Sequence, residues 1–424
     1  MTQRAKAVFA LVLAASLTGH VLGLLAPEKQ PATRDSAGRD FASYYYAAEV
    51  ASQGGDPWSL EAIRKAAAED GLRKNVHPFF YPPPYLLLTG WAPRVSLLRG
   101  FEIWKWIDEF ATLLTGVVLA VSWRALGTKR DSVLGPAIVP STVAALLGGM
   151  YAVEYGHQMG QANFLVLLVT LVGLWVEPRR PWLGGALIGL ACMWKMSPAL
   201  FVLWWLLHRR WRSVAAAGIA AIALSVAALP LAGPAEQLRF YTDILPGFGS
   251  GNYNGLTIRI DMFGNHSVPN VFEQIWPGDQ SRLTPPAQAA STATALALVA
   301  GLGFLFRREP ADPVARAAQI GAICVALLLV PVYTYEHHLV WAIPAIVAAI
   351  AAVWQGRLHL GWAVPLGLAI AALAMPLPDL KEVATTMLTG PAAWFVQEAK
   401  FLSLVSLCGA CAVAGVRAPR TSAG

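Results

Sequence analysis

Apolar runs of nearly membrane-spanning length follow one another along almost the whole chain, separated by short polar segments. They occupy residues 7–25, 101–123, 133–150, 162–176, 182–196, 198–207, 213–232, 287–306, 314–332, 338–354, 360–375 and 392–415. A transmembrane helix needs roughly 20 apolar residues. The pattern predicts an all-α polytopic membrane protein of about 12 transmembrane helices, within a range of roughly ten to thirteen because several runs are short.

Lysine and arginine positions predict the orientation of these helices. Basic residues fall at every second junction: Arg4 and Lys6; Arg124, Lys129 and Arg130; Arg179 and Arg180; Arg209, Arg210 and Arg212; Arg307, Arg308 and Arg316; Arg357; and Arg417 and Arg420. The short segments 151–161 and 333–337 contain none. Because short cytoplasmic loops are enriched in Lys and Arg, both termini are predicted to be cytoplasmic.

This orientation places two long segments outside, 26–100 and 233–286. The first is predicted to carry two interfacial helices. One covers about 42–53, and the other begins at Asp56-Pro57, where an N-cap residue precedes a proline. The apolar run up to residue 98 contains Pro93 and Arg94, so it is predicted to be re-entrant or interfacial.

Composition supports one membrane domain over residues 1–424. The chain is 56% hydrophobic and 13% charged, whereas soluble domains carry about 25% charged residues. Its net charge of +7 is divided among short clusters, which does not predict nucleic-acid binding. The first run resembles a signal peptide but lacks a clean cleavage site before Pro27, so an uncleaved span is expected. Cys408 and Cys411 lie in an apolar run and are expected to be packing residues, not a redox pair.

Polar residues from five distant stretches fall on the predicted outer face. They are Asp40; Glu154, His157, Gln158, Gln161 and Asn163; Lys195; Asn252, Asn254, Arg259, Asp261, Asn265, His266 and Ser267; and Tyr335, Glu336, His337 and His338. Several sit inside the apolar boundary, where polar side chains mark functional sites. A shared cavity is therefore expected. The alternative is that each polar residue only contacts solvent at the surface of its own loop. Lys195 is placed at the apex of a broken hairpin between two runs.

Two local patterns allow more than one interpretation. His337 and His338 are neighbours, and adjacent helical residues point about 100° apart, so metal ligation is less expected than a hydrogen bond or charge to a phosphate. Asn265-His266-Ser267 matches a glycosylation sequon, but a backbone-ordering or substrate-binding role is expected instead.

The ordered set of polar motifs resembles glycosyltransferase family 87, whose members have the GT-C architecture. The motifs are Asp40-Phe41-Ala42-Ser43-Tyr44-Tyr45, Phe80-Tyr81-Pro82-Pro83, Gly160-Gln161-Ala162-Asn163, Lys195-Met196-Ser197-Pro198, Gly264-Asn265-His266-Ser267 and His337-His338-Leu339-Val340. They extend over residues 40–340. His266 departs from the glutamine usual in the family. The resemblance implies a polyprenyl-phosphate-linked sugar donor, with mannose or in some relatives arabinofuranose. No cofactor is expected, and no residue is assigned as a metal ligand; metal dependence is left open.

The resemblance also implies roles for individual residues. Asp40 corresponds to the catalytic base, and a single base with an attacking hydroxyl implies inversion. Lys195, Arg259, His337 and His338 are expected to bind the donor phosphate, and Tyr44, Tyr45, Tyr81, Gln161, Asn163, Asn265 and Ser267 to bind substrate. The alternatives are structural: Asp40 as a helix cap, Lys195 as a snorkelling side chain, Arg259 in a loop ion pair, and the tyrosines as an interfacial belt.

The expected partners are the lipid-linked donor, a glycolipid or glycan acceptor and the bilayer, with no nucleic acid. The expected location is the cell membrane, with the active site on its extracytoplasmic face. A secondary transporter of a sugar or lipid-linked substrate is the main rival, since about 12 spans suit it, but transporters often contain two similar halves and no such repeat is present in the sequence. A non-catalytic assembly subunit is the second rival.

Overall fold

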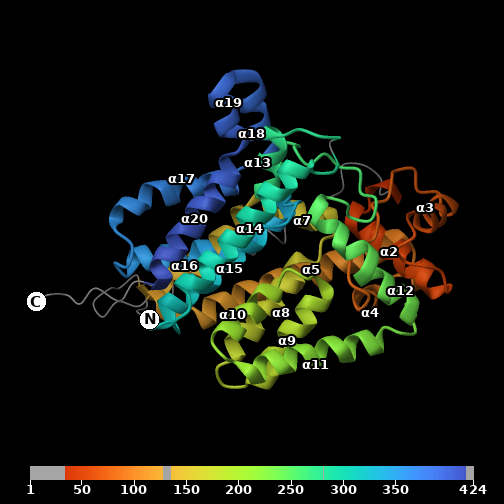
Figure 1. Ribbon diagram of the computed structural model, residues 1–424, viewed down its shortest axis with the longest axis horizontal. Helices are drawn as coiled ribbons and strands as arrows, with labels where there is room; N and C mark the ends of the chain where they lie inside the picture. Colours follow the sequence, from red (N-terminus) through yellow and green to blue (C-terminus); the bar gives the residue numbers. More distant parts are fainter. Residues whose placement is uncertain (1–33, 128–134, 280, 417–424) are drawn as a thin grey trace, which may run out of the picture.

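The computed structural model describes residues 34–127, 135–279 and 281–416, and Figure 1 shows that these residues form a helical bundle. They contain helices and turns and no strand, so the predicted all-α class is confirmed for this part of the chain. The predicted uncleaved first span at 7–25 and the basic residues Arg4, Lys6, Lys129, Arg130, Arg417 and Arg420 lie outside the described residues.

The helices follow in chain order. They are α2 (Arg39–Ser52), α3 (Leu60–Glu69), α4 (Tyr85–Thr89), α5 (Leu97–Ser122), α6 (Gly135–Gly149), α7 (Tyr151–Met159), α8 (Asn163–Val176), α9 (Pro181–Trp194), α10 (Ala199–Leu207), α11 (Trp211–Ala227), α12 (Pro234–Arg239), α13 (Val268–Ile275), α14 (Pro285–Leu305), α15 (Pro313–Leu329), α16 (Ile343–Trp354), α17 (Ala363–Ala374), α18 (Leu377–Glu382), α19 (Gly390–Gln397) and α20 (Ala399–Val416). A 3₁₀ helix, η6 (Glu336–Ala342), precedes α16. Helices α2, α3 and α4 gather at one end of the molecule, on the right in Figure 1.

Three helical segments of the described chain are long and apolar enough to cross a membrane, and the number rises to five if each of two bent pairs counts as one span. The three are Pro285–Leu305, Glu336–Trp354 and Ala399–Val416. Four further apolar helices, among them α8 and α9, have 10–17 residues. The protein is thus a helical membrane protein, and the total of about 12 spans remains a prediction.

The predicted hairpin at Lys195 is present. Helix α9 ends at Lys195, whose backbone is extended, and α10 begins just after Pro198. Small residues allow α9 to pack closely on α11: a Cβ added at Gly189 would lie 2.5 Å from the carbonyl oxygen of Ala217. Close backbone approach through small residues is typical of helix packing in membranes, and here it fixes the direction in which α9 carries Lys195.

Three predicted boundaries are wrong. The second interfacial helix begins at Leu60 with Ser59 as its N-cap, because Asp56 Oδ1 instead accepts a hydrogen bond from the Trp58 amide in a turn (3.0 Å). The segment 151–161 was expected to be a short loop, but most of it forms α7, which is bent by 52° from the preceding helix. The run 392–415 is interrupted at Glu398, between α19 and α20.

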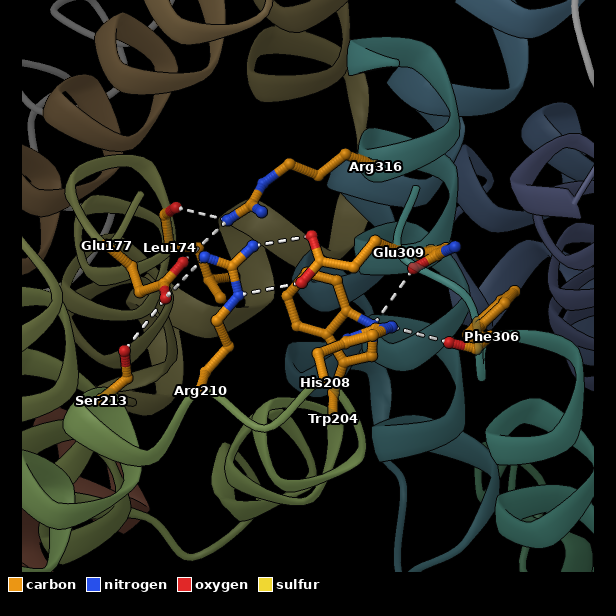
Figure 2. Close-up of polar contacts among 10 residues, drawn as sticks. Leu174, Glu177, Trp204, His208, Arg210, Ser213, Phe306, Glu309 and Arg316 are labelled. Atoms are coloured by element: carbon orange, nitrogen blue, oxygen red, sulfur yellow. Dashed lines mark hydrogen bonds and ion pairs between the residues drawn. The ribbon is translucent and has the colours of Figure 1, made fainter. Parts of the chain in front are cut away.

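An ionic network around the buried Glu177 joins three turns at one end of the bundle. Glu177, at the end of α8, accepts a hydrogen bond from Ser213 Oγ at 3.0 Å and lies 3.4 Å from a guanidinium nitrogen of Arg316. Figure 2 shows Arg210 between Glu177 and Glu309, and its Nε and NH2 donate to the Glu309 carboxylate at 3.1 and 2.7 Å. The network therefore holds the α8–α9, α10–α11 and α14–α15 junctions together.

Candidate active site

A cavity of about 510 Å³ lies at the opposite end of α8, α9 and α10 from the Glu177 network. Ligand pockets usually have volumes of about 300–1,000 Å³. Six of the expected site residues line it: Asp40, Tyr81, Gln161, Lys195, His337 and His338. The cavity thus brings together residues that are as far apart in sequence as Asp40 and His338.

Asp40 lies in the first turn of α2, and its residue is only 7% exposed. The N-cap of this helix is Gly38, and no side chain caps it, so Asp40 does not serve as the helix cap. Instead, Gln161 Nε2 donates to Asp40 Oδ2 at 2.7 Å, and His77 Nδ1 lies 3.4 Å from Asp40 Oδ1. The carboxylate is therefore oriented by two side chains at the cavity wall.

Two glycines permit the approach of Gln161 to Asp40. Gly160 has a φ of 70°, and a Cβ there would lie 2.7 Å from Cβ of Phe41. A Cβ at Gly38 would lie 2.5 Å from the carbonyl oxygen of Met159. A left-handed backbone and close contact both favour glycine, so these residues fix the backbone between α7 and Gln161.

The surroundings of Asp40 favour its ionised form. Burial raises the pKa of its carboxyl group, but the hydrogen bonds of His77 and Gln161 lower it, and the result is a pKa below the ordinary aspartate value. Asp40 is therefore a carboxylate at neutral pH, able to accept a hydrogen bond or a proton.

A chain of hydrogen bonds connects the hairpin apex to the histidine pair. Lys195 Nζ donates to Asn163 Oδ1 at 2.7 Å, and Asn163 Nδ2 donates to the carbonyl oxygen of His337 at 2.7 Å. Asn163 does not line the cavity; it positions Lys195 and His337, which do. His338 Nδ1 accepts a hydrogen bond from the Tyr335 amide at 3.0 Å, which fixes its ring at the start of η6.

Buried polar atoms in the cavity wall that have no hydrogen-bond partner among the described residues include Gln161 Oε1 and His337 Nδ1. Gln161 is 3% exposed and His337 is 5% exposed. Buried polar groups usually have partners, so these two atoms are suited to contact a bound substrate.

Residues 265–267 support the site from behind. Asn265 Nδ2 and Ser267 Oγ both donate to the carbonyl oxygen of Val332 at 2.9 Å, and Asn265 Oδ1 accepts from the Thr334 amide at 2.9 Å. Neither Asn265 nor Ser267 lines the cavity. Of the two roles expected for this motif, the contacts support backbone ordering of the segment that leads to His337.

Glu336 lines the cavity but is held in a buried ionic triad. His266 Nε2 lies 2.7 Å from Glu336 Oε1, and Lys400 Nζ donates to Glu336 Oε2 at 2.6 Å. All three residues are at most 1% exposed. His266 therefore binds Glu336 through a ring nitrogen, at the position where the family resemblance would lead one to expect a glutamine.

The tyrosines and Arg259 take different places from the other expected site residues. Tyr81 lines the cavity, and its hydroxyl shares a 2.9 Å hydrogen bond with that of Tyr44, which is fully buried behind it. Tyr45 donates to the Val95 carbonyl at 2.8 Å and lies outside the cavity wall. Arg259 is also outside the wall: its side chain is 55% exposed and paired with Asp261 at 2.6 Å, as in the loop ion pair considered as its alternative.

Sequence reasoning missed several lining residues, among them Arg39, His77 and Tyr155, and it missed Lys400 behind them. His77 stands only two residues before Phe79, close to a recognised motif, and Arg39 is next to Asp40; this proximity was the available signal. Lys400 had no such signal, because nothing near it in the sequence marks its pairing with Glu336.

A second, smaller cavity of about 150 Å³ is apolar and shares Leu200 and Leu203 with the first. Its other lining residues come from α10, α14, α15 and the residue after α14: Trp204, Leu207, Val299, Leu302, Gly303, Phe306, Ile323 and Ala326. Trp204 and Phe306 also take part in the polar contacts of Figure 2. The two cavities therefore adjoin at Leu200 and Leu203 of α10, and the smaller one lies towards the network end of the bundle.

A family model described as Glycosyltransferase family 87 matches residues 79–331. This range includes Tyr81, Gln161 and Lys195, while Asp40 and the histidine pair lie outside it.

Several curated proteins are similar to this chain. It is 30% identical over 298 residues to a polyprenol-phosphate-mannose-dependent alpha-(1-2)-phosphatidylinositol mannoside mannosyltransferase of Mycolicibacterium smegmatis, with 66% of this chain and 63% of that protein covered. It is 27% identical over 309 residues to a phosphatidylinositol pentamannoside mannosyltransferase of the same organism, covering 70% and 67%. An alpha-(1->3)-arabinofuranosyltransferase of Mycobacterium tuberculosis is 35% identical over 201 residues, 44% of each chain. The chain thus spans less than two thirds of the length of the first of these relatives.

Proposed function

This chain belongs to glycosyltransferase family 87, and we propose that it is an inverting membrane enzyme that moves a mannosyl residue from a polyprenyl-phosphate donor to a hydroxyl group of a glycolipid acceptor. The observation that carries the proposal is the shared cavity: a buried, ionised Asp40 faces the same space as Lys195 and His337. The mannosyl donor and the glycolipid acceptor are those named for the similar mycobacterial enzymes.

Asp40 acts as the general base. The acceptor hydroxyl attacks the anomeric carbon from the face opposite the phosphate, and Asp40 removes its proton as the new bond forms. Such assistance accelerates reactions by about 10²–10⁴-fold. Retention would need a second carboxylate about 5 Å away to act as nucleophile. The other carboxylate of the wall, Glu336, has both oxygens bound by His266 and Lys400, so the wall supports inversion.

The donor phosphate requires positive charge as it leaves. Lys195 supplies it from the hairpin apex, with its ammonium group oriented by Asn163. The unpartnered nitrogen of His337 is a further contact in the same wall. Preorganised donors of this kind stabilise developing negative charge without rearrangement of the site. Arg259 is left out of this role because its guanidinium is exposed and bound to Asp261.

The prenyl chain of the donor extends from the first cavity towards the adjoining apolar cavity between α10, α14 and α15. Each buried methylene contributes about 0.8 kcal/mol to binding. We place the reaction on the outer face of the cytoplasmic membrane, because the arginine-rich turns around Glu177 lie at the far end of α8, about 20 Å away for its 14 residues, and arginine-rich turns favour the cytoplasm.

The test is direct transfer by the purified chain in detergent or proteoliposomes. Polyprenyl-phosphate mannose and polyprenyl-phosphate arabinofuranose are each supplied with a phosphatidylinositol mannoside acceptor, and the product is identified by mass and by the anomeric configuration of the new bond. We expect an α-mannosylated lipid. Transfer of arabinofuranose alone would show that the donor sugar is arabinofuranose and not mannose. Sugar counterflow without any product would show that the protein is a transporter and not an enzyme.

A further inference from the structure

Of the described residues that line the active-site cavity, Arg39 and Lys195 carry an arginine or lysine side chain. Lys195 is partly buried and donates to Asn163 at 2.7 Å, and its role at the donor phosphate is given above. Arg39 is exposed, and its guanidinium makes no hydrogen bond or ion pair within the described part of the chain. Arg39 is therefore an unpaired cation on the open side of the cavity.

The fold gains nothing evident from a cation at position 39. Arg39 is the first residue of α2, where the partial positive charge of the helix N-terminus disfavours a cation. Its charge also reaches a second cation: burial and Arg39 lower the pKa of Lys74, whereas Asp35 raises it. A positive charge at an unfavourable place in the wall of a cavity is expected of a group that binds an anionic ligand.

The two cations approach Asp40 from different elements. Lys195, at the end of α9, acts electrostatically on Asp40 and on His337. Arg39 directly precedes Asp40 in α2 and acts on Lys74 of the first outer segment. Asp40 therefore has one cation beside it on its own helix and another that reaches it from α9.

The proposed reaction brings two lipids to this wall. In an inverting transfer, the attacking hydroxyl and the leaving group lie on opposite faces of the sugar. The donor phosphate belongs with Lys195, and the acceptor belongs with Asp40, which removes its proton. The acceptors named for the similar mycobacterial enzymes are phosphatidylinositol mannosides, and a phosphatidyl group contains an anionic phosphodiester. An acceptor of this kind needs a second cation, on the Asp40 side of the cavity.

We propose that Arg39 binds the phosphodiester of an anionic glycolipid acceptor and selects that class of acceptor over neutral glycans. The inference rests on the proposed function and names the group by which the acceptor is recognised. A guanidinium group suits this task, because its planar fork binds phosphate through two parallel hydrogen bonds. Since the Cα atoms of consecutive residues are about 3.8 Å apart, the pair Arg39 and Asp40 favours an acceptor in which few sugar rings separate the phosphate from the reacting hydroxyl.

The experiment changes the charge of the acceptor and the charge of Arg39 in one cycle. The acceptors are phosphatidylinositol monomannoside and the same lipid with its phosphate methylated to a neutral triester. Wild type and Arg39→Gln are assayed in neutral detergent with polyprenyl-phosphate mannose. We expect kcat/KM of wild type to be about tenfold lower for the triester, the effect of one charge-assisted contact. Arg39→Gln should use both acceptors equally, at about the lower value.

Three controls accompany this cycle. Arg64→Gln is the matched variant, because Arg64 is exposed in α3 and does not line the cavity; it should keep the tenfold preference. Arg39→Lys should keep part of it, because lysine retains the charge but not the fork. In Arg39→Gln the donor KM, measured with the triester, should change by less than about twofold, and the melting temperature should be that of wild type.

Three results would overturn this role of Arg39 while leaving the enzyme assignment intact. One is a wild-type preference for the anionic lipid below about threefold. Another is an equal loss on both acceptors in Arg39→Gln, which would indicate that Arg39 only orients α2. The third is a raised donor KM in Arg39→Gln, which would assign the guanidinium to the donor phosphate. Failure of wild type to mannosylate any acceptor, anionic or neutral, would overturn the proposed function as well.

Discussion

The two ends of α8 lie beside two buried carboxylates with opposite surroundings. Glu177 is enclosed: a serine hydroxyl and the guanidinium groups of Arg210 and Arg316 surround it, and it lines no cavity found among the described residues. Asp40 is held by a neutral amide and by a partly exposed imidazole, and it faces a cavity of about 510 Å³. Burial alone therefore does not identify a carboxylate that could react with a substrate. The distinguishing feature is that Asp40 faces a cavity, whereas Glu177 does not.

The difference also has an energetic meaning. A buried ion pair such as that of Glu177 is strongly destabilised when one partner is removed, because a charge remains without compensation. A carboxylate held by neutral or weakly paired groups is easier to replace without unfolding the protein. The two regions should consequently respond differently to substitution, one in stability and the other in turnover.

The largest effect is expected at Asp40. Asp40→Asn retains the shape of the side chain but cannot remove a proton, so kcat should fall by about 10³-fold or more, while the melting temperature changes by no more than a few degrees. Product formation by mass spectrometry and thermal unfolding in detergent measure the two quantities. Near-parental turnover would reject Asp40 as the base.

The next effect is expected at Lys195. Lys195→Ala removes the ammonium group from the donor phosphate, so kcat/KM for the donor should fall about 10²-fold, with a smaller change for the acceptor. Arg259→Ala is the matched cation control and should change both by less than about twofold, since the exposed pair with Asp261 contributes little. Equal losses for donor and acceptor in Lys195→Ala would indicate a folding role instead.

At Glu177 the expected effect is on stability. Glu177→Ala leaves Arg316 without its carboxylate partner, and we expect a loss of about 2 kcal/mol in unfolding free energy, below the usual value for fully buried pairs because both arginines are partly exposed. Turnover per folded molecule should be unchanged. A variant with normal stability and reduced turnover would contradict the division between the two regions.

The smallest effect concerns acid stability. The pKa of Asp40 is lowered in the folded protein, so its charge contributes stability above the ordinary aspartate range, and this contribution is lost as the pH falls through the lowered pKa. The stability difference between wild type and Asp40→Asn should be constant from neutral pH down to about pH 5 and shrink below about pH 4. Denaturant titrations at a series of pH values measure it. A stability difference that grows on acidification would show that folding raises the pKa of Asp40 and does not lower it.

The sequence by itself determined the class of the protein and predicted several residues that line the cavity. Long apolar runs require helices in a membrane, because backbone polar groups must be satisfied within each segment. Asp40, Lys195 and His337 stood out because polar residues inside apolar boundaries are costly and are kept for function. The helix break at Lys195 followed from the proline three residues later.

Only the tertiary structure decided which residues meet. Gln161 binds Asp40 across 121 residues and Asn163 binds His337 across 174, and no local pattern records such pairs. The structure also made Asn265 and Ser267 supports, left Arg259 outside the cavity wall and brought His77 to Asp40. The physical reason is that hydrophobic periodicity reports which face of an element is buried, whereas partners across the bundle depend on how closely helices pack, which here is set by glycines such as Gly160.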